Sequence, residues 1–304
     1  MKTTVFEERS GGITISRVIC DFEYNMASRH FHEEYEIYYL LEGERYYFID
    51  HSTHLVRNGS LVFINKNQVH KTSPVAGSSY HDRILIQLNS KQSDPVFTGS
   101  DFSLEEFFTE HCGVIRLDMD QQKYVEKLIY DMVREIREGQ EGCRLMTGMR
   151  LMELLIYAAR CLRQNDLYPV PAMLQTEKYL KVQEIADYIS ENYRNAGSLE
   201  EIAGRFFISK SYLSRIFKEV TGFTVNEYLN IRRIMKAKQL LSTPEPNVTA
   251  ISEMLGYENV SYFERVFKKY AHTTPLRFRR QVLEDKKQLT ERMGQSIITD
   301  KSEQ

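Results

Sequence analysis

The sequence lacks the features that would place it in or across a membrane. No run of about 18 apolar residues occurs, so no segment is expected to cross a bilayer as a helix. The first residues, Met-Lys-Thr-Thr-Val-Phe-Glu-Glu-Arg, contain no apolar core of a signal peptide. Cysteines are few and form no close pair, which argues against a disulfide framework or a zinc knuckle and predicts a cytoplasmic protein. They are Cys20, Cys112, Cys143 and Cys161.

A strong net charge is also missing, but the charge is unevenly divided. Residues 1–180 contain 20 Lys+Arg against 26 Asp+Glu, whereas residues 181–304 contain 20 against 16. A basic C-terminal part beside an acidic N-terminal part fits nucleic-acid binding at one end of the chain. Because the basic excess is modest, non-specific affinity for DNA should be modest too. A chain of 304 residues that is 42% hydrophobic can form two domains with cores of their own.

Two short helices around a glycine turn are predicted near the C-terminus. Val248 to Leu255 suits a helix with one buried face, and Gly256 can end it by adopting a positive φ. Val260 to Tyr270 suits a second helix, with apolar residues on one face and basic or hydroxyl-bearing residues on the other. A helix-turn-helix needs this arrangement to enter a major groove.

The same unit occurs twice. The run SYLSRIFK at Ser211–Lys218 is repeated as SYFERVFK at Ser261–Lys268. Amphipathic helix pairs are common in all-α proteins, so one copy alone would be weak evidence for DNA binding. A duplication at a fixed period instead indicates two copies of one supersecondary unit.

Residues from about Val182 to Arg280 resemble the DNA-binding domain of the AraC/XylS family of bacterial transcription regulators. Val225 and His272 depart from the family pattern, which usually has Pro and Gly at these positions. The resemblance implies two recognition helices in successive major-groove segments of a double-stranded DNA operator. It also implies an activator rather than a repressor, with RNA polymerase as a partner, carbohydrate-related target genes and a sugar as a possible effector.

The outward positions of the two recognition helices are the candidate DNA-binding residues. Arg can read guanine with two hydrogen bonds and Glu can accept from cytosine, whereas Lys is better suited to phosphate. The candidates are Lys210, Ser211, Ser214, Arg215, Lys218, Asn259, Ser261, Tyr262, Glu264, Arg265 and Lys268.

From Thr14 to about Leu88 the chain is rich in β-branched and aromatic residues with polar breaks, which predicts an antiparallel sandwich or barrel. His30, His32, Glu36 and Gly43, followed by Gly59 and His70, resemble the two motifs of the cupin barrel. Asn65 and Asn67 replace the Pro and Gly of the second motif. The expected fold class is therefore α+β: a cupin-like barrel and an all-α domain with two helix-turn-helix motifs.

The cupin-like residues are candidates for a ligand pocket inside the barrel. Three histidines and a carboxylate could also bind a divalent transition metal, although polar lining without a metal is the main expectation. The candidate ligand-binding residues are His30, His32, Glu36, Tyr38, Tyr46 and His70, and the candidate metal ligands among them are His30, His32, Glu36 and His70.

Helices are predicted over 121–138 and 143–163, and the second is apolar nearly all round. It could cover the barrel or form a homodimer contact, and we favour the dimer, with Leu155 and Leu162 as contacts. We expect a ligand-sensing domain over 1–100, a helical dimerisation region over 101–164, a linker over 165–180, a DNA-binding domain over 181–283 and a flexible tail over 284–304.

Two functions are compatible with this organisation. The first is a ligand-responsive, sequence-specific DNA-binding transcription regulator without enzymatic activity. The alternative is a cupin metal-dependent enzyme fused to a DNA-binding module. The alternative requires the histidine and glutamate set to hold a metal that is open to substrate.

Overall fold

The computed structural model describes residues 1–22, 32–75, 77–89, 102–165 and 177–300. Contacts divide the chain into two compact units. The first contains Met1–Gln183 with Val220–Gly222, and the second contains Glu184–Glu219 with Phe223–Gln304. No helix in the described part of the chain is long and apolar enough to span a bilayer.

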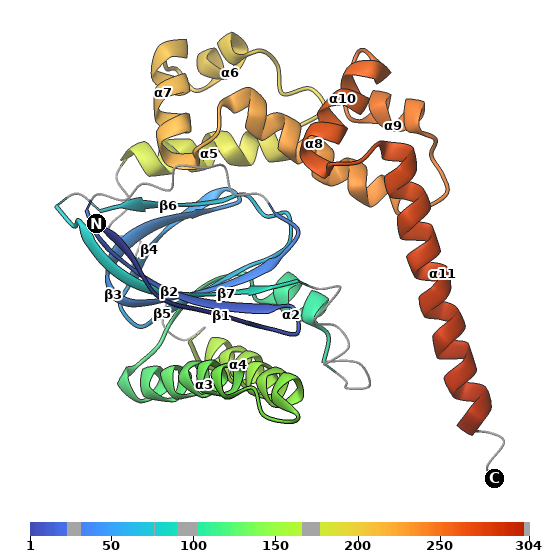
Figure 1. The fold of residues 1–304 in the computed structure, drawn as a ribbon. Helices are drawn as coiled ribbons and strands as arrows, with labels where there is room; N and C mark the ends of the chain where they lie inside the picture. The colour runs from blue at the N-terminus through green and yellow to red at the C-terminus, as the bar shows by residue number, and fades with distance from the viewer. Residues whose placement is uncertain (23–31, 76, 90–101, 166–176, 301–304) are drawn as a thin grey trace. The chain divides into compact units, whose positions relative to one another are not determined.

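The strands of the first unit form an antiparallel barrel, as the sequence predicted (Figure 1). The sheet has the order β1-β2-β7-β3-β5-β8, and β4 and β6 also pair with β3. The strands are β1 (Lys2–Ser10), β2 (Ile13–Asp21), β3 (Tyr35–Ile49), β4 (Ser52–Arg57), β5 (Ser60–Ile64), β6 (His70–Pro74), β7 (Tyr80–Leu88) and β8 (Gly113–Arg116). Strand β1 precedes the region in which the sequence indicated strands.

Strand β3 pairs with four other strands and runs unbroken from Tyr35 to Ile49. Its register against β7 shifts between Leu40 and Glu42, and Gly43 has φ +102°. This bulge changes which alternate residues face inward. Glu36, Tyr38 and Leu40 face inward before the bulge, and Tyr47 follows the opposite parity after it.

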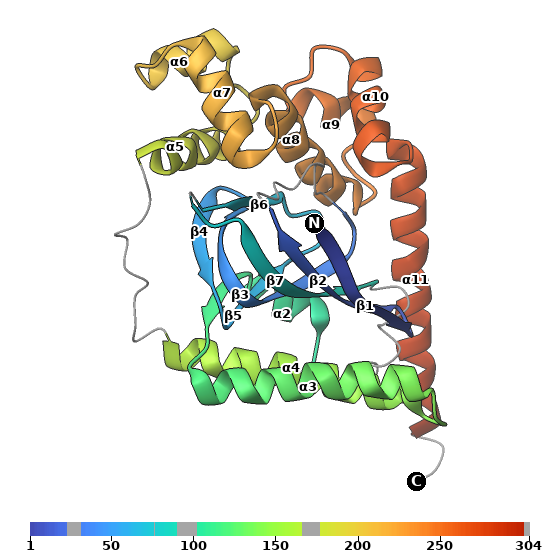
Figure 2. The same cartoon turned by 60° about the vertical axis from the view of Figure 1, so that its left-hand side comes forward.

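The two faces of the sheet bury different sets of residues. The interior apolar cluster is Tyr38, Leu40, Tyr47, Ile49, Val56, Val62 and Ile64. On the outer face, Ile37 and Tyr39 join the larger core, which also includes Phe63 and residues of three helices. These helices are α2 (Leu104–Glu110), α3 (Met119–Glu138) and α4 (Cys143–Asn165). Figures 1 and 2 show α3 and α4 side by side along this face of the barrel.

Most apolar residues of α4 are buried against the barrel and α3. Leu155 is fully buried in this core, and Leu162 packs against it. The expectation that these two leucines form a dimer contact is therefore wrong for Leu155, which lies inside a single chain. Leu145 and Met149, in contrast, remain 58% and 56% exposed on the outer side of the same helix.

The second unit is all helical. Its helices are α5 (Glu177–Glu191), α6 (Leu199–Arg205), α7 (Lys210–Thr221), α8 (Val225–Leu241), α9 (Val248–Met254), α10 (Val260–Ala271) and α11 (Pro275–Asp300). α6 with α7, and α9 with α10, form the two predicted helix-turn-helix motifs, and α8 joins them. α5 begins at Glu177, inside the expected linker. α11 continues to Asp300 where a flexible tail was expected, because no proline interrupts a run of good helix formers.

Gly43 provides a test of the bulge in β3. A Cβ atom at Gly43 would lie 2.5 Å from the carbonyl oxygen of Tyr80, and φ is +102°. We expect Gly43→Ala to lower the free energy of unfolding by about 1–3 kcal/mol in urea denaturation. Gly77 also has a positive φ but nothing within 4 Å of the added Cβ, so Gly77→Ala is the matched control. Equal losses in both variants would contradict the importance of the close approach at Gly43.

Candidate functional site

Both recognition helices bury one stripe and expose another, as the repeat predicted. On α7, Leu213 and Phe217 are fully buried, and on α10 the equivalent Phe263 and Phe267 are fully buried. All candidate DNA-binding residues on the two helices are exposed. They are Lys210, Ser211, Ser214, Arg215 and Lys218 on the first helix, and Asn259, Ser261, Tyr262, Glu264, Arg265 and Lys268 on the second.

Local hydrogen bonds fix where each recognition helix begins. The Asn259 side-chain oxygen accepts from the backbone N–H groups of Ser261 and Tyr262, at 2.8 and 3.3 Å. Ser209 Oγ accepts from the backbone N–H of Tyr212, at 3.2 Å. Asn259, a predicted DNA-binding residue, is therefore the N-cap of α10, and its side-chain oxygen is engaged in capping.

A tyrosine and an arginine stack on the exposed face of each recognition helix. The Arg215 guanidinium lies 5.3 Å from the ring centroid of Tyr212, and that of Arg265 lies 5.1 Å from the ring centroid of Tyr262. Stacking on an aromatic ring restricts a long cationic side chain while leaving its hydrogen-bond donors available. Sequence reasoning missed Tyr212, although the repeat aligns it with Tyr262.

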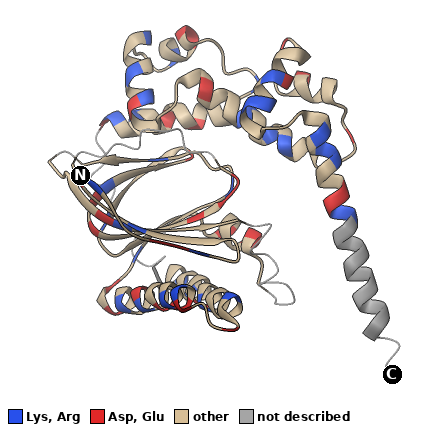
Figure 3. Ribbon diagram, viewed as in Figure 1, with Lys and Arg blue, Asp and Glu red and all other residues tan. Residues whose placement is uncertain are grey.

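Acidic side chains contact some of the candidate cations. Lys210 forms an ion pair with Glu200, and Arg215 Nη1 lies 4.0 Å from Glu219 Oε2. Exposed ion pairs contribute little stability, so exchange of a carboxylate for a phosphate would cost little. Figure 3 shows Lys and Arg interspersed with acidic residues over these helices, which agrees with a modest basic excess.

Inside the barrel, the structure brings together three of the four cupin-like residues. One ligand atom from each of His32, Glu36 and His70 lies within 4.8 Å of the others. Glu36 Oε2 is 3.3 Å from His32 Nε2 and 3.8 Å from His70 Nε2. The Tyr47 hydroxyl donates to Glu36 Oε1 at 3.0 Å, which orients the carboxylate. His30 lies outside the described residues.

Both imidazole rings are held by their other nitrogen. His32 Nδ1 lies 3.1 Å from the carbonyl oxygen of Glu34, and His70 Nδ1 lies 2.9 Å from that of Gln68. A carbonyl only accepts, so each Nδ1 carries the proton and donates it. The two Nε2 atoms then face Glu36, where a proton or a cation must separate a nitrogen lone pair from the carboxylate. The same arrangement orients histidines in metal sites.

Burial and charge shift the pKa values of this group. Burial opposes ionisation of Glu36, but the charge of His70 and the hydrogen bond from His32 outweigh it and lower its pKa to about 2. Burial would lower the pKa of His32, yet its hydrogen bond to Glu36 and the charge of Glu36 raise it. The two histidines therefore keep the Glu36 carboxylate ionised although it is buried.

Of the two tyrosines predicted to line the pocket, Tyr38 faces the barrel interior and Tyr46 does not. Tyr38 is 2% exposed, and its buried hydroxyl makes no hydrogen bond to any described residue. Burial raises the pKa of Tyr38 to about 12, so the hydroxyl stays protonated. Tyr46 is not brought to the interior, because after the bulge the neighbouring Tyr47 faces inward and strand side chains alternate.

A second polar group of the barrel was missed by sequence reasoning. The Arg83 guanidinium lies 5.7 Å from the Tyr38 ring centroid. Arg45 is 1% exposed, and its Nη2 donates to Thr72 Oγ1 at 3.0 Å. Burial, together with the charges of Arg45 and Arg83, lowers the pKa of His81 to about 3. The register shift in β3 places Arg45 inward, and Gly43 beside the shift is the local sequence signal that could have indicated it.

A polar-lined barrel and a duplicated helix-turn-helix define a class of ligand-responsive DNA-binding regulators, and comparisons with known proteins agree. The AraC-like ligand binding domain model matches residues 19–155, and the Helix-turn-helix domain model matches residues 202–281. The regulatory protein PocR of Salmonella typhimurium is 30% identical over 214 residues, which cover 61% of this chain and 70% of PocR. This chain belongs to the AraC family of transcriptional regulators.

Other similar proteins are less fully covered or more distant. YijO of Escherichia coli, an uncharacterised helix-turn-helix regulator, is 33% identical over 127 residues, covering 42% of this chain and 45% of YijO. The arabinose operon regulatory protein of Salmonella typhimurium is 23% identical, covering 73% of this chain and 75% of that protein. The crystal structure of ToxT from Vibrio cholerae is 13% identical and covers 90% of this chain and 99% of ToxT, with a TM-score of 0.34.

Proposed function

We propose that this regulator binds a two-part operator through α7 and α10 and acts as a dimeric, effector-controlled activator of carbohydrate-related genes. The observation that carries the DNA-binding assignment is the repeated Tyr–Arg stack on the exposed face of both helices. Two recognition helices joined by one helix suit major-groove segments about 34 Å apart on one face of the duplex. Activation would bring RNA polymerase as a partner. The similarity to an arabinose operon regulator supports a sugar effector.

Arg215 and Arg265 are assigned to base or phosphate contacts. Replacing either with Ala should cost about 1–3 kcal/mol of binding free energy for a duplex selected by the wild-type protein. Titration of labelled duplex at fixed salt measures this cost. Arg134→Ala, on α3 of the sensor unit, removes the same charge from an exposed side chain and serves as the control. If both recognition-helix variants bind as tightly as the control, the assignment is wrong.

The effector site is proposed for the barrel interior. His32, Glu36 and His70 supply polar groups at one place, and the Tyr38 hydroxyl supplies a buried donor with no hydrogen bond to the described residues. A ligand with several hydroxyl groups would satisfy these groups while its carbon skeleton contacts the apolar interior cluster. This chemistry fits a sugar.

A divalent transition metal is a second candidate for the same interior, favoured by the geometry of the two Nε2 atoms and Glu36. Glu36 Oε2 lies 3.3 Å from His32 Nε2 and 3.8 Å from His70 Nε2. Ligand atoms around a tetrahedral zinc ion are expected to lie about 3.3 Å apart. When bound, such an ion would supply a Lewis acid that anchors an effector hydroxyl or carboxylate. The alternative of a fused metal enzyme needs the same ion.

Metal binding can be tested directly on the purified chain. Zinc or cobalt at about 100 times its dissociation constant should raise the free energy of unfolding by about 2.7 kcal/mol, read as a higher Tm. Glu36→Gln and His70→Gln should lose this shift, while His54→Gln, a histidine elsewhere in the barrel, should keep it. Elemental analysis after chelation and reloading should recover about one ion per chain. An unchanged Tm with zinc, cobalt and nickel would leave polar lining as the role of these residues.

A dimer contact is proposed along the outer side of α4. Leu145, Met149, Met152 and Ile156 recur at intervals of four, three and four residues, which places them on one stripe, although Met152 also packs against the core. This is the spacing of a coiled-coil seam, and the first two residues are more than half exposed. A two-fold contact between copies of α4 would bury the stripe on both chains.

Charge placed on this stripe should separate the dimer. We expect Leu145→Glu with Met149→Glu to give a folded monomer by light scattering at micromolar concentration, because two buried charges per chain oppose association. Met119→Glu, at an exposed apolar residue of α3 outside the stripe, should leave the mass unchanged. A wild-type protein that is already monomeric with and without effector would exclude this contact.

A further inference from the structure

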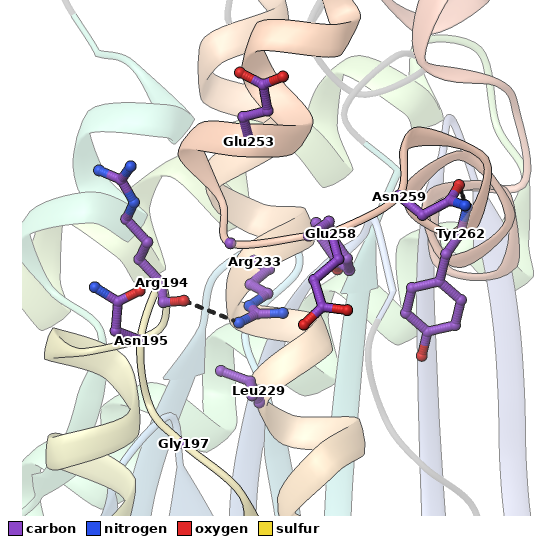
Figure 4. Close-up of a pocket in the computed structure, with 11 residues that line it drawn as sticks. Arg194, Asn195, Gly197, Leu229, Arg233, Glu253, Glu258, Asn259 and Tyr262 are labelled. Carbon is purple, nitrogen blue, oxygen red and sulfur yellow. Dashed lines mark hydrogen bonds between the residues drawn. The ribbon is translucent and has the colours of Figure 1, made fainter.

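Arg233, on α8, holds the segment that follows α5. Its Nε donates to the backbone carbonyl of Tyr193 at 2.8 Å, and its Nη2 donates to that of Arg194 at 3.2 Å. Figure 4 shows the side chain reaching from α8 toward Arg194, with a dashed line for the second bond. The guanidinium therefore ties the linking helix to the segment between α5 and the first helix-turn-helix.

The same guanidinium also contacts the second helix-turn-helix. It lies 4.9 Å from the ring centroid of Tyr257, which belongs to the turn between α9 and α10. The Tyr257 hydroxyl donates to Asn230 Oδ1 on α8 at 3.0 Å, in a buried position. One side chain thus joins three segments: the segment that follows α5, the linking helix and the turn that precedes the second recognition helix.

Gly256 brings two of these segments into direct contact. A Cβ atom at this position would lie 2.1 Å from the Arg194 carbonyl oxygen, and φ is +78°. Only glycine allows the turn of the second motif to approach this backbone so closely. Tyr193, in the same segment as Arg194, also packs against the core of the second motif.

The second motif has its own core, built on Ile234, Ala237 and Leu241 of α8. Beside the Arg233 contact lies a cleft of about 850 Å³, with Arg194 and Asn195 on one side and Glu253, Glu258 and Tyr262 on the other (Figure 4). The segment that follows α5 therefore meets the second motif along the edge of this cleft, at the contacts of Arg233 and Tyr193.

We propose that Arg233 is a positioning residue that sets the angle between α7 and α10 about the linking helix, and so makes DNA binding depend on the spacing of two subsites. The proposal rests on the proposed function in one respect, namely that both recognition helices bind DNA. Arg233 itself needs no DNA contact. Its guanidinium suits the role because a planar fork donates to two carbonyls while its face lies against a ring.

The test uses the full chain and a duplex that it selects from a random-sequence library. Affinity is measured for this duplex and for derivatives with one base pair inserted or deleted between the subsites. Wild type should bind the derivatives at least tenfold more weakly. Arg233→Met should bind the selected duplex more weakly yet reduce that spacing preference by roughly tenfold, as expected for lost hydrogen bonds to a charged group. Arg233→Lys, which keeps the charge but not the fork, should lie between them.

Lys236→Met is the matched control. It removes a cation from the same helix, and Lys236 is exposed and hydrogen-bonded to Gln239 of α8. It should leave the spacing preference intact even if affinity falls. Gly256→Ala must displace the Arg194 carbonyl and should weaken the spacing preference as Arg233→Met does. It provides an independent test if Arg233→Met fails to fold.

The outcomes separate this proposal from the assignment of DNA binding. Equal weakening of Arg233→Met on every duplex, with helix content unchanged, would overturn the positioning role. No spacing preference in wild type would overturn it as well. Selection of duplexes with a single subsite would instead contradict the use of both recognition helices, which is a failure of the proposed function.

Discussion

The alternation of side chains along β3 is the constraint on which the sensor domain depends. This strand pairs with four others, and its two faces meet different surroundings. Glu36 and Tyr38 face the barrel interior, while Ile37 and Tyr39 pack with the helices on the outside. The bulge that follows Leu40 changes the parity, so that Arg45 and Tyr47 face inward. A one-residue slip would reverse every one of these placements, which is why the close approach at Gly43 matters.

The DNA-binding unit depends on a shared helix, because each of its motifs is too small to bury a core alone. The C-terminal half of α8 supplies apolar residues to the core of the second motif. In its N-terminal half, the ring of Tyr228 packs against Phe217 of the first recognition helix, with the ring centroids 5.4 Å apart. Sharing one helix fixes where each motif begins. A shared helix does not by itself fix how the two motifs are rotated about its axis. The polar contacts of Arg233 and Tyr257 restrict that rotation.

Much of this architecture could be predicted from sequence, and the failures share a cause. The 3.6-residue periodicity of α9 and α10 is local, so the limits of both helices were predicted within one residue. The His32, Glu36 and His70 set followed from motif spacing. Tyr46 was assigned to the interior and Arg45 was missed because the bulge depends on pairing with β7, a long-range contact. Leu155 was assigned to a dimer because an all-round apolar helix does not reveal which side the barrel covers.

These placements limit how an effector can act. A ligand shifts a conformational equilibrium only by its difference in affinity for the two states. On β3 the interior residues alternate with residues that contact the helical hairpin, and the Tyr39 hydroxyl donates to Glu126 of α3 at 2.8 Å. A ligand in the proposed interior site that displaces the strand at Glu36 or Tyr38 would therefore also displace Ile37 and Tyr39. In the proposed mode of action, the helices packed on that face, including the outer stripe of α4, would then respond to occupancy of the interior without any ligand contact of their own. Coupling through one strand is reciprocal, so a second chain on that stripe would alter effector affinity by the same factor.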